Sequence, residues 1–129
     1  MKIVNVAAAV IRDGNRIFAT QRGYGEFKDM WEFPGGKIEE GETAEQALIR
    51  EIREELDADI LVNGYIDTVE YDYPSFHLSM QCFWCEPGTG SITLLEHESA
   101  AWLKKDELMS VNWLPADLEL IPVLKKFLQ

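Results

Sequence analysis

The sequence predicts a mixed α+β sandwich, built as one domain over residues 1–129. Length and composition give the first indication. The chain has 129 residues, of which 47% are apolar, and this is enough for one sizeable core but not for two. The order of the predicted elements gives the second indication. A β-hairpin, a strand, a helix, further strands and a closing helix follow one another, an order typical of a sheet with helices packed against it.

The charge of the chain restricts its partners. Twelve Lys and Arg against 23 Asp and Glu give a net charge of −11, which is unfavourable for binding a nucleic-acid polymer. A small phosphorylated molecule is compatible with this charge if metal ions bridge the two anions. The N-terminus lacks the features of a signal peptide, and no apolar run approaches the length of a membrane span. We therefore expect a soluble, cytoplasmic protein without a membrane partner.

The first third of the chain predicts a hairpin and a short strand. Ile3 to Ile11 is rich in Val, Ile and Ala and is expected as a buried strand. After a turn at residues 13–15, Arg16 to Arg22 is expected to return as the second strand of the hairpin. Residues 23–29 predict a glycine-bearing loop. Trp31 to Lys37 predicts a short strand that leads into the next loop.

An amphipathic helix is predicted from about Ala44 to Leu56. Thr43 and Gln46 have the spacing of a capping box, in which each side chain bonds the other residue's backbone N–H. Apolar residues recur at helical spacing and form a stripe that should face the core: Leu48, Ile52 and Leu56, flanked by Ala44 and Ala47.

Three glutamates border this stripe within an arc of about 100°: Glu51, Glu54 and Glu55. Like charges near the C-terminal end of a helix destabilise it, so a positive partner is expected there. Carboxylate oxygens on successive turns suit a hard cation such as Mg²⁺ or Mn²⁺. The alternative is a solvated acidic face, partly relieved by Arg50 and Arg53.

The second half of the chain predicts two long strands. Ile60 to Tyr73 is rich in aromatic and β-branched residues, and Phe76 to Cys85 alternates apolar and polar residues, which predicts a half-buried strand. Cys82 and Cys85 should point to opposite faces of that strand as ordinary reduced cysteines. A zinc site is disfavoured because the sequence contains no second Cys pair.

The remaining segments predict a turn at Gly88–Gly90, a short strand at Ile92 to Leu95 and a helical turn at Lys105 to Met109. From Pro115 onward we expect one amphipathic helix, which Pro122 either kinks or begins. Its apolar face should consist of Leu118, Ile121, Leu124 and Phe127.

Residues 36–58 read G-x5-E-x7-R-E-I-x-E-E-x-D-A. This stretch resembles the Nudix box, G-x5-E-x7-R-E-U-x-E-E-x-G-U, and matches its first glycine and every charged position. Asp57 replaces the usual Gly, and Ala58 replaces a larger apolar residue. Since Asp tolerates the positive φ of a position just after a helix, we expect a small loss of stability and no loss of chemistry. The resemblance implies the Nudix fold, a mixed sheet sandwiched between helices.

The stretch EHESAAW, Glu96 to Trp102, is similar to the E-H-x4-W stretch of MutT-type Nudix chains, which are nucleoside triphosphate pyrophosphohydrolases. In such enzymes water attacks a phosphorus atom and releases a nucleoside monophosphate and pyrophosphate. The resemblance implies a Mg²⁺ site, with Mn²⁺ as an alternative, whose ligands would be the Gly35 carbonyl, Glu51, Glu54, Glu55 and Glu96.

The resemblance also implies roles around this ion. Either Glu51 or Glu96 accepts the proton from water. Glu98 is the second choice for the role of Glu96, and both can instead be solvated loop acids. Arg50 is expected to orient carboxylates by bidentate pairing, and Glu42 to support the loop.

The substrate-binding residues are expected on both sides of this site. Arg22 matches a MutT position that contacts substrate, and Lys37 can contact a phosphate. Asp117 stands where MutT enzymes for oxidised guanine have Asn. Ionised Asp only accepts hydrogen bonds, which favours an exocyclic amine such as cytosine N4 or adenine N6 over strict 8-oxo-guanine selection. Asp117 can also cap the last helix. Three aromatic residues can either stack on the base or belong to the core: Trp31, Phe33 and Phe76.

Two other functions stay open at this point. One is hydrolysis of another nucleoside diphosphate derivative, such as ADP-ribose. The other is a catalytically silent, nucleotide-binding Nudix module, but such modules typically lose box carboxylates and this chain keeps them all. The expected role is sanitation of the nucleotide pool by a monomer or homodimer that acts on a small-molecule nucleotide.

Overall fold

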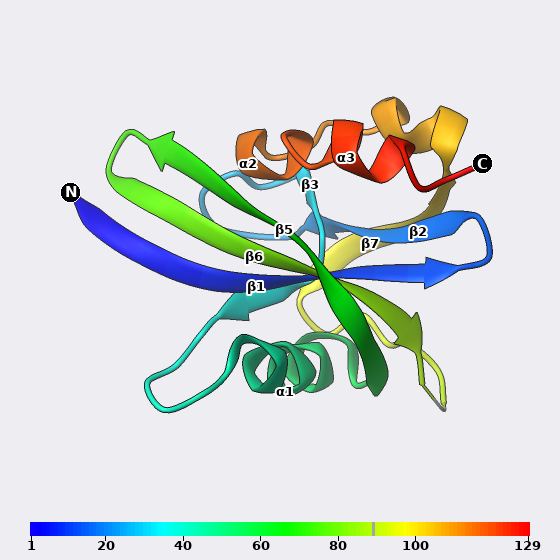
Figure 1. Ribbon diagram of the computed structural model, residues 1–129, viewed down its shortest axis with the longest axis horizontal. Coiled ribbons are helices and arrows are strands. Elements are labelled where there is room, and N and C mark those ends of the chain that lie inside the picture. Colours follow the sequence, from blue (N-terminus) through cyan, green and yellow to red (C-terminus); the bar gives the residue numbers. More distant parts are fainter. Residues whose placement is uncertain (89) are drawn as a thin grey trace.

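The computed structural model describes residues 1–88 and 90–129, in which a seven-stranded mixed sheet lies between helices (Figure 1). Helix α1 (Ala44–Leu56) covers the lower face in this view, and α2 (Pro115–Leu118) and α3 (Ile121–Lys125) cover the upper face. The expected sandwich is confirmed. Within the described ranges, we find no helix with the length and hydropathy needed to cross a membrane.

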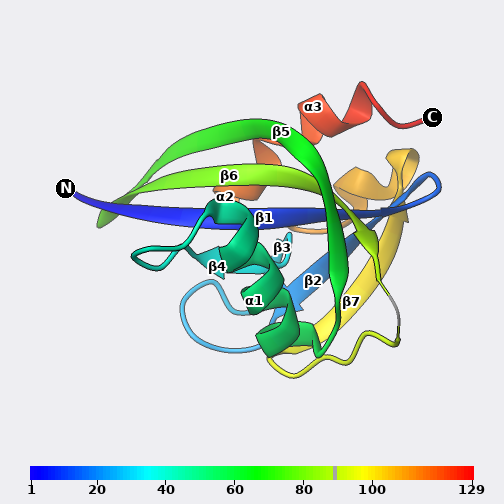
Figure 2. The same cartoon turned by 60° about the horizontal axis from the view of Figure 1, so that its bottom comes forward.

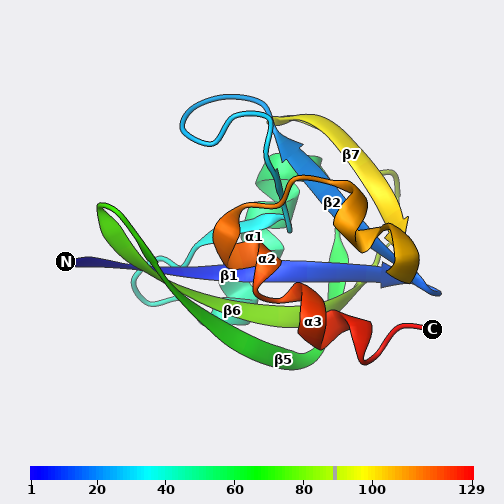
Figure 3. The same cartoon turned by 90° about the horizontal axis from the view of Figure 1, so that it is seen from above.

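The strands are β1 (Lys2–Asp13), β2 (Arg16–Arg22), β3 (Trp31–Glu32), β4 (Gly35–Lys37), β5 (Ile60–Tyr73), β6 (Phe76–Pro87) and β7 (His97–Lys104). β1 is the central strand, because it pairs in parallel with β6 and antiparallel with β4. β5 continues the sheet beyond β6. β2 diverges from β1 after the hairpin turn and pairs with β3 and β7 (Figure 3).

β1 is buried on both faces, as its continuous apolar sequence predicts. Ala8 and Val10 belong to the core under the C-terminal helices, whereas Ala9 and Ile11 belong to the core under α1. Alternate side chains of a strand point to opposite faces, so a strand between two layers needs apolar residues at every position. Figure 2 shows α1 brought forward beside β1 and β4.

Helix α1 begins and ends as predicted. The Thr43 hydroxyl accepts the Gln46 N–H, and the Gln46 side chain accepts the Thr43 N–H. The expected apolar stripe is buried in the core. Asp57 adopts the left-handed conformation (φ 48°), and its N–H donates to the Arg53 carbonyl. The Gly-to-Asp departure in the box is therefore accommodated by the backbone.

Two expected strands differ in the structure. Residues 31–37 form two short strands, because the Phe33 N–H donates to Asp117 and Pro34 has no N–H to donate. Residues 92–95 form no strand. They follow the end of α1 instead, where the N–H groups of Thr93 and Leu95 bond two terminal carbonyls of the helix. The predicted turn at Gly88–Gly90 includes Thr89, which lies outside the described residues.

β6 is more buried than the alternating pattern suggested. Met80 and Cys82 face the core under the C-terminal helices, while Phe83 and Cys85 are buried on the opposite face, under α1. The two cysteines are free and point to opposite faces, as expected. Burial raises the pKa of both thiols, that of Cys85 to about 12. Both therefore stay protonated and unreactive at neutral pH.

The single C-terminal helix that we expected is broken into α2 and α3. Pro122 cannot donate a hydrogen bond to the Leu118 carbonyl, and it lies in the first turn of α3. The break turns the apolar face, so that Leu118 and Phe127 are exposed, contrary to the prediction. The buried residues of this segment are Leu114, Ala116, Leu120, Ile121, Leu124 and Leu128. The helical turn at Lys105–Ser110 agrees with the prediction.

Candidate active site

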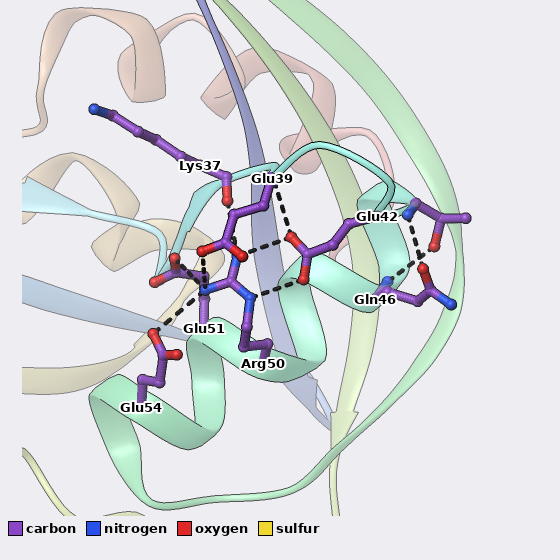
Figure 4. Close-up of polar contacts among 8 residues, drawn as sticks. Lys37, Glu39, Glu42, Gln46, Arg50, Glu51 and Glu54 are labelled. Atoms are coloured by element: carbon purple, nitrogen blue, oxygen red, sulfur yellow. Dashed lines mark hydrogen bonds and ion pairs between the residues drawn. The ribbon is translucent and has the colours of Figure 1, made fainter.

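The charged residues of the box surround Arg50 (Figure 4). Arg50 binds Glu42 in a bidentate manner, from Nε to Oε2 (2.8 Å) and from Nη2 to Oε1 (2.9 Å). Its Nη1 donates to Glu51 Oε1 (3.0 Å) and, more weakly, to Glu54 Oε2 (3.4 Å). Its Nη2 also donates to the Lys37 carbonyl (3.0 Å). One guanidinium thus ties the loop, β4 and helix α1 together.

Glu42 fixes the loop that precedes α1. Its Oε1 accepts the Glu39 backbone N–H at 2.9 Å, and its own N–H donates to the Glu39 carbonyl. The hydrogen bonds from Arg50, followed by that from the Glu39 backbone, lower the pKa of Glu42 to about 2. This carboxylate is therefore ionised and already engaged, as expected of a residue that supports the loop.

Glu51 occupies space that Gly36 leaves free. A Cβ atom at Gly36 would lie 2.4 Å from Glu51 Cδ, so any larger residue would displace the carboxylate. Gly35 is equally restricted, since a Cβ there would lie 2.0 Å from the Ala7 carbonyl oxygen. The side chain of Glu51 is 17% exposed, and its burial raises its pKa. The two glycines let β4 approach the carboxylate on α1 closely.

Glu55 is the most perturbed carboxyl group of the box. It is 8% exposed, and its Oε2 has no hydrogen-bond partner. Burial raises the pKa of Glu55 to about 9, helped by the negative charges of Glu51, Glu32 and Glu96. A buried carboxylate among other carboxylates needs a positive charge beside it to ionise at neutral pH.

The three box glutamates do not converge as we predicted. Glu54 is 57% exposed on the outer side of α1, and Arg50 holds both Glu51 and Glu54. Over residues 1–88 and 90–129, no three His, Cys, Asp or Glu side chains are grouped so as to hold a metal ion where they lie. The donor set nevertheless fits a hard cation, because oxygen ligands predominate and Glu55 Oε2 is buried without a partner.

An acidic cavity of about 240 Å³ lies beside this end of α1. Glu55, Glu96 and His97 border it together with Glu32 and the backbone of Gly35. Glu96 and Glu55 thus meet at one cavity although 41 positions separate them in the sequence. Glu96 is exposed, just before β7 begins, and Glu98 does not border this cavity.

A second, apolar pocket of about 250 Å³ adjoins the acidic cavity. The two share three lining residues: Arg22, Glu32 and Gly35. The apolar walls come from β1, β5, β6 and the loop after β2, and consist mainly of Val4, Val6, Phe27, Tyr73, Phe76, Leu78 and Met80. The rings of Tyr73 and Phe76 stack with centroids 5.1 Å apart. This arrangement offers an apolar place for a flat ring next to an acidic place for a cation.

Asp117 borders the apolar pocket from α2. It is 5% exposed, and its Oδ2 accepts the Phe33 N–H at 2.9 Å. Burial raises the pKa of Asp117 to about 7. The prediction that Asp117 caps the last helix is wrong, because Leu114 is the N-cap of α2 and Asp117 lies within that helix. Its carboxyl group instead joins α2 to the backbone after β3.

Arg22 faces both cavities, but Glu32 engages it. Arg22 Nε and Nη2 donate to the two Glu32 oxygens at 2.9 and 2.7 Å. Sequence reasoning did not single out Glu32, although it directly precedes Phe33 in the glycine-bearing entry to the box. It also missed His97, whose only signal was its place beside Glu96 in the EHESAAW stretch.

The remaining predicted substrate residues differ in exposure. Phe33 is buried against Trp113, with ring centroids 4.6 Å apart, so it belongs to the core although it lines the pocket. Trp31 does not line the pocket, whereas Phe76 does. Lys37 is exposed on β4, also borders the pocket, and directs its side chain away from the Arg50 cluster (Figure 4).

Comparison with known proteins decides the family, since residues 1–127 match the NUDIX domain. The chain belongs to the Nudix family. It is 32% identical over 129 residues to the CTP pyrophosphohydrolase of Escherichia coli (strain K12), covering 99% of this chain and 93% of that protein. It is 33% identical over 128 residues to the 8-oxo-dGTP diphosphatase of the same strain, covering 98% and 99%. The solution structure of the E. coli ORF135 protein superposes with a TM-score of 0.83 at 31% identity, covering 98% of this chain and 89% of that one. The expected assignment to the Nudix hydrolases is confirmed.

Proposed function

We propose that this Nudix hydrolase cleaves nucleoside and deoxynucleoside triphosphates to the nucleoside monophosphate and pyrophosphate, with Mg²⁺ or, alternatively, Mn²⁺. The observation that carries the proposal is the shared wall of the two cavities. Arg22, Glu32 and Gly35 border both the acidic cavity and the apolar pocket. A base in the pocket would therefore place its phosphates beside the box carboxylates.

The residues that would hold the cation are the Gly35 carbonyl, Glu51, Glu54, Glu55 and Glu96. A bound divalent cation neutralises phosphate charge and lowers the pKa of water. Arg50 positions Glu51 and Glu54 by its hydrogen bonds. Gly36 supports the same position of Glu51, because it leaves room for the carboxylate.

In the proposed reaction the oxygen of a water molecule bonds to phosphorus, and the P–O bond to the departing pyrophosphate breaks. The water gives up a proton to a carboxylate. Glu51 and Glu96 are both placed for this task, since Glu51 lies against β4 and Glu96 borders the acidic cavity. Arg22 and Lys37 supply positive charge to the phosphates, and both border the apolar pocket.

Asp117 is proposed to read the base at one wall of the pocket, with Tyr73, Phe76 and Phe33 as its apolar surroundings. An ionised Asp accepts a hydrogen bond from an exocyclic amine, which favours cytosine. The E. coli relative named CTP pyrophosphohydrolase supports this choice. We place the enzyme in the cytoplasm, as a monomer or homodimer that clears unwanted nucleotides and binds no nucleic-acid polymer.

Pyrophosphate release from a panel of substrates tests the proposal. The panel contains CTP, dCTP, the other triphosphates, 8-oxo-dGTP and ADP-ribose, each with Mg²⁺ and with EDTA. We expect Mg²⁺-dependent release that is fastest with a cytidine nucleotide. Glu51→Gln and Glu96→Gln should both reduce kcat, and the general base is the residue whose removal also abolishes the acidic limb of the pH–rate profile. Absence of release from every triphosphate would refute the proposed reaction.

A further inference from the structure

Two side-chain atoms are buried without a hydrogen-bond partner in the described part of the chain: Glu55 Oε2 and His97 Nδ1. The two residues are neighbours, with His97 Nε2 3.9 Å from Glu55 Oε2. Both border the acidic cavity, and the His97 side chain is only 7% exposed. Since buried polar atoms nearly always have a partner, two such atoms at one place indicate a functional arrangement rather than simple packing.

A β-bulge brings His97 to this place. Gln21 pairs with Ser99, but the next residue, Arg22, pairs with His97, so Glu98 is passed over in the register. In a regular ladder Glu98 would stand opposite Arg22. An extra residue in one strand re-aims the neighbouring side chains, and such bulges are common beside active sites. Here the bulge presents an imidazole at the place where a regular ladder would put a third carboxylate near Glu55.

We propose that His97 is a positioning residue for Glu55, whose Nε2–H donates to Glu55 Oε2 and holds the carboxylate in place for the cation. This inference rests on the proposed function. The two atoms need to approach by about 1 Å to reach hydrogen-bond distance. A neutral imidazole that donates from Nε2 keeps Nδ1 as an acceptor, which matches the atom that is without a partner. Residues that hold a metal ligand by its free oxygen commonly tune metal affinity.

Mn²⁺ binding to the nucleotide-free protein, followed by electron paramagnetic resonance, tests this role without turnover. His97→Leu should weaken Mn²⁺ binding about 10- to 100-fold, the usual effect of losing a residue that orients a metal ligand. His97→Gln, whose amide N–H reaches about as far as Nε2–H, should bind Mn²⁺ within about threefold of the parent. His77→Leu changes the other histidine, which is remote on β6, and should leave Mn²⁺ affinity unchanged.

A double variant asks whether His97 acts through Glu55. Glu55→Gln should weaken Mn²⁺ binding, and adding His97→Leu to it should cause no further loss. The proposal is overturned if His97→Leu binds Mn²⁺ as tightly as the parent, if His97→Gln loses as much as His97→Leu, or if the loss persists in the Glu55→Gln background. Thermal melting in EDTA checks that each variant folds. Should His97→Leu not fold, His97→Asn replaces it, because its shorter amide cannot reach Glu55 and the same loss is expected.

The outcomes also separate this inference from the proposed function. A parent protein that binds no Mn²⁺ and releases no pyrophosphate overturns both. A parent that binds Mn²⁺ and hydrolyses triphosphate, together with an unaffected His97→Leu variant, overturns the role of His97 alone.

Discussion

Replacing Asp117 by Asn should make folding stability less dependent on pH. The pKa of Asp117 is about 7 in the folded protein because of burial, against about 3.9 for an unfolded Asp. A raised folded pKa means that the protonated carboxyl favours the folded state. This contribution is complete below the unfolded pKa and is lost as the pH rises toward and through the folded pKa. From these two pKa values, the parent should lose about 2 kcal/mol relative to Asp117→Asn between about pH 5.5 and about pH 8.

Urea denaturation in EDTA at the two pH values measures this difference without metal or substrate. Asn keeps an oxygen for the Phe33 N–H, so the hydrogen bond between α2 and the backbone after β3 is retained. Asp67→Asn is the matched control, because Asp67 is exposed on β5, and its pH dependence should follow that of the parent. The reasoning fails if the difference in unfolding free energy between the parent and Asp117→Asn is the same at both pH values.

Three further predictions concern the box and the sheet. Gly36→Ala should reduce kcat/KM about 100-fold while Mg²⁺-free thermal stability changes little, since the added methyl displaces a reacting carboxylate; unchanged kinetics would refute the need for glycine. Arg50→Lys should lower kcat/KM about tenfold or more, because Lys cannot bind a carboxylate in a bidentate manner, and activity equal to the parent would exclude the positioning role. Asp72 and Glu70 raise the pKa of His77, so their stabilisation is complete below about pH 6.5 and is lost as the pH rises through the raised folded pKa. His77→Gln should therefore destabilise the protein more near pH 6 than near pH 9 in urea melts, and a uniform effect would contradict this assignment.

The sequence by itself determined the parts whose causes are local. The capping pair Thr43 and Gln46, the apolar spacing of α1 and the turn after β1 depend on residues within a few positions of one another. Periodicity reports which side of an element is apolar, and the spacing of the box was enough to indicate the family. For the same reason Asp57 was correctly expected to accept a left-handed conformation.

Only the tertiary structure decided which distant residues meet at the site. The hydrogen bond from Phe33 to Asp117 spans 84 positions, and the approach of His97 to Glu55 depends on a bulge between β2 and β7. The apolar face of the last segment also changed, because the missing N–H of Pro122 separates two helices. Local periodicity shows that a side chain is to be buried but not which segment covers it. Packing between elements therefore set the two cavities, the partner of Arg22 and the buried state of Asp117.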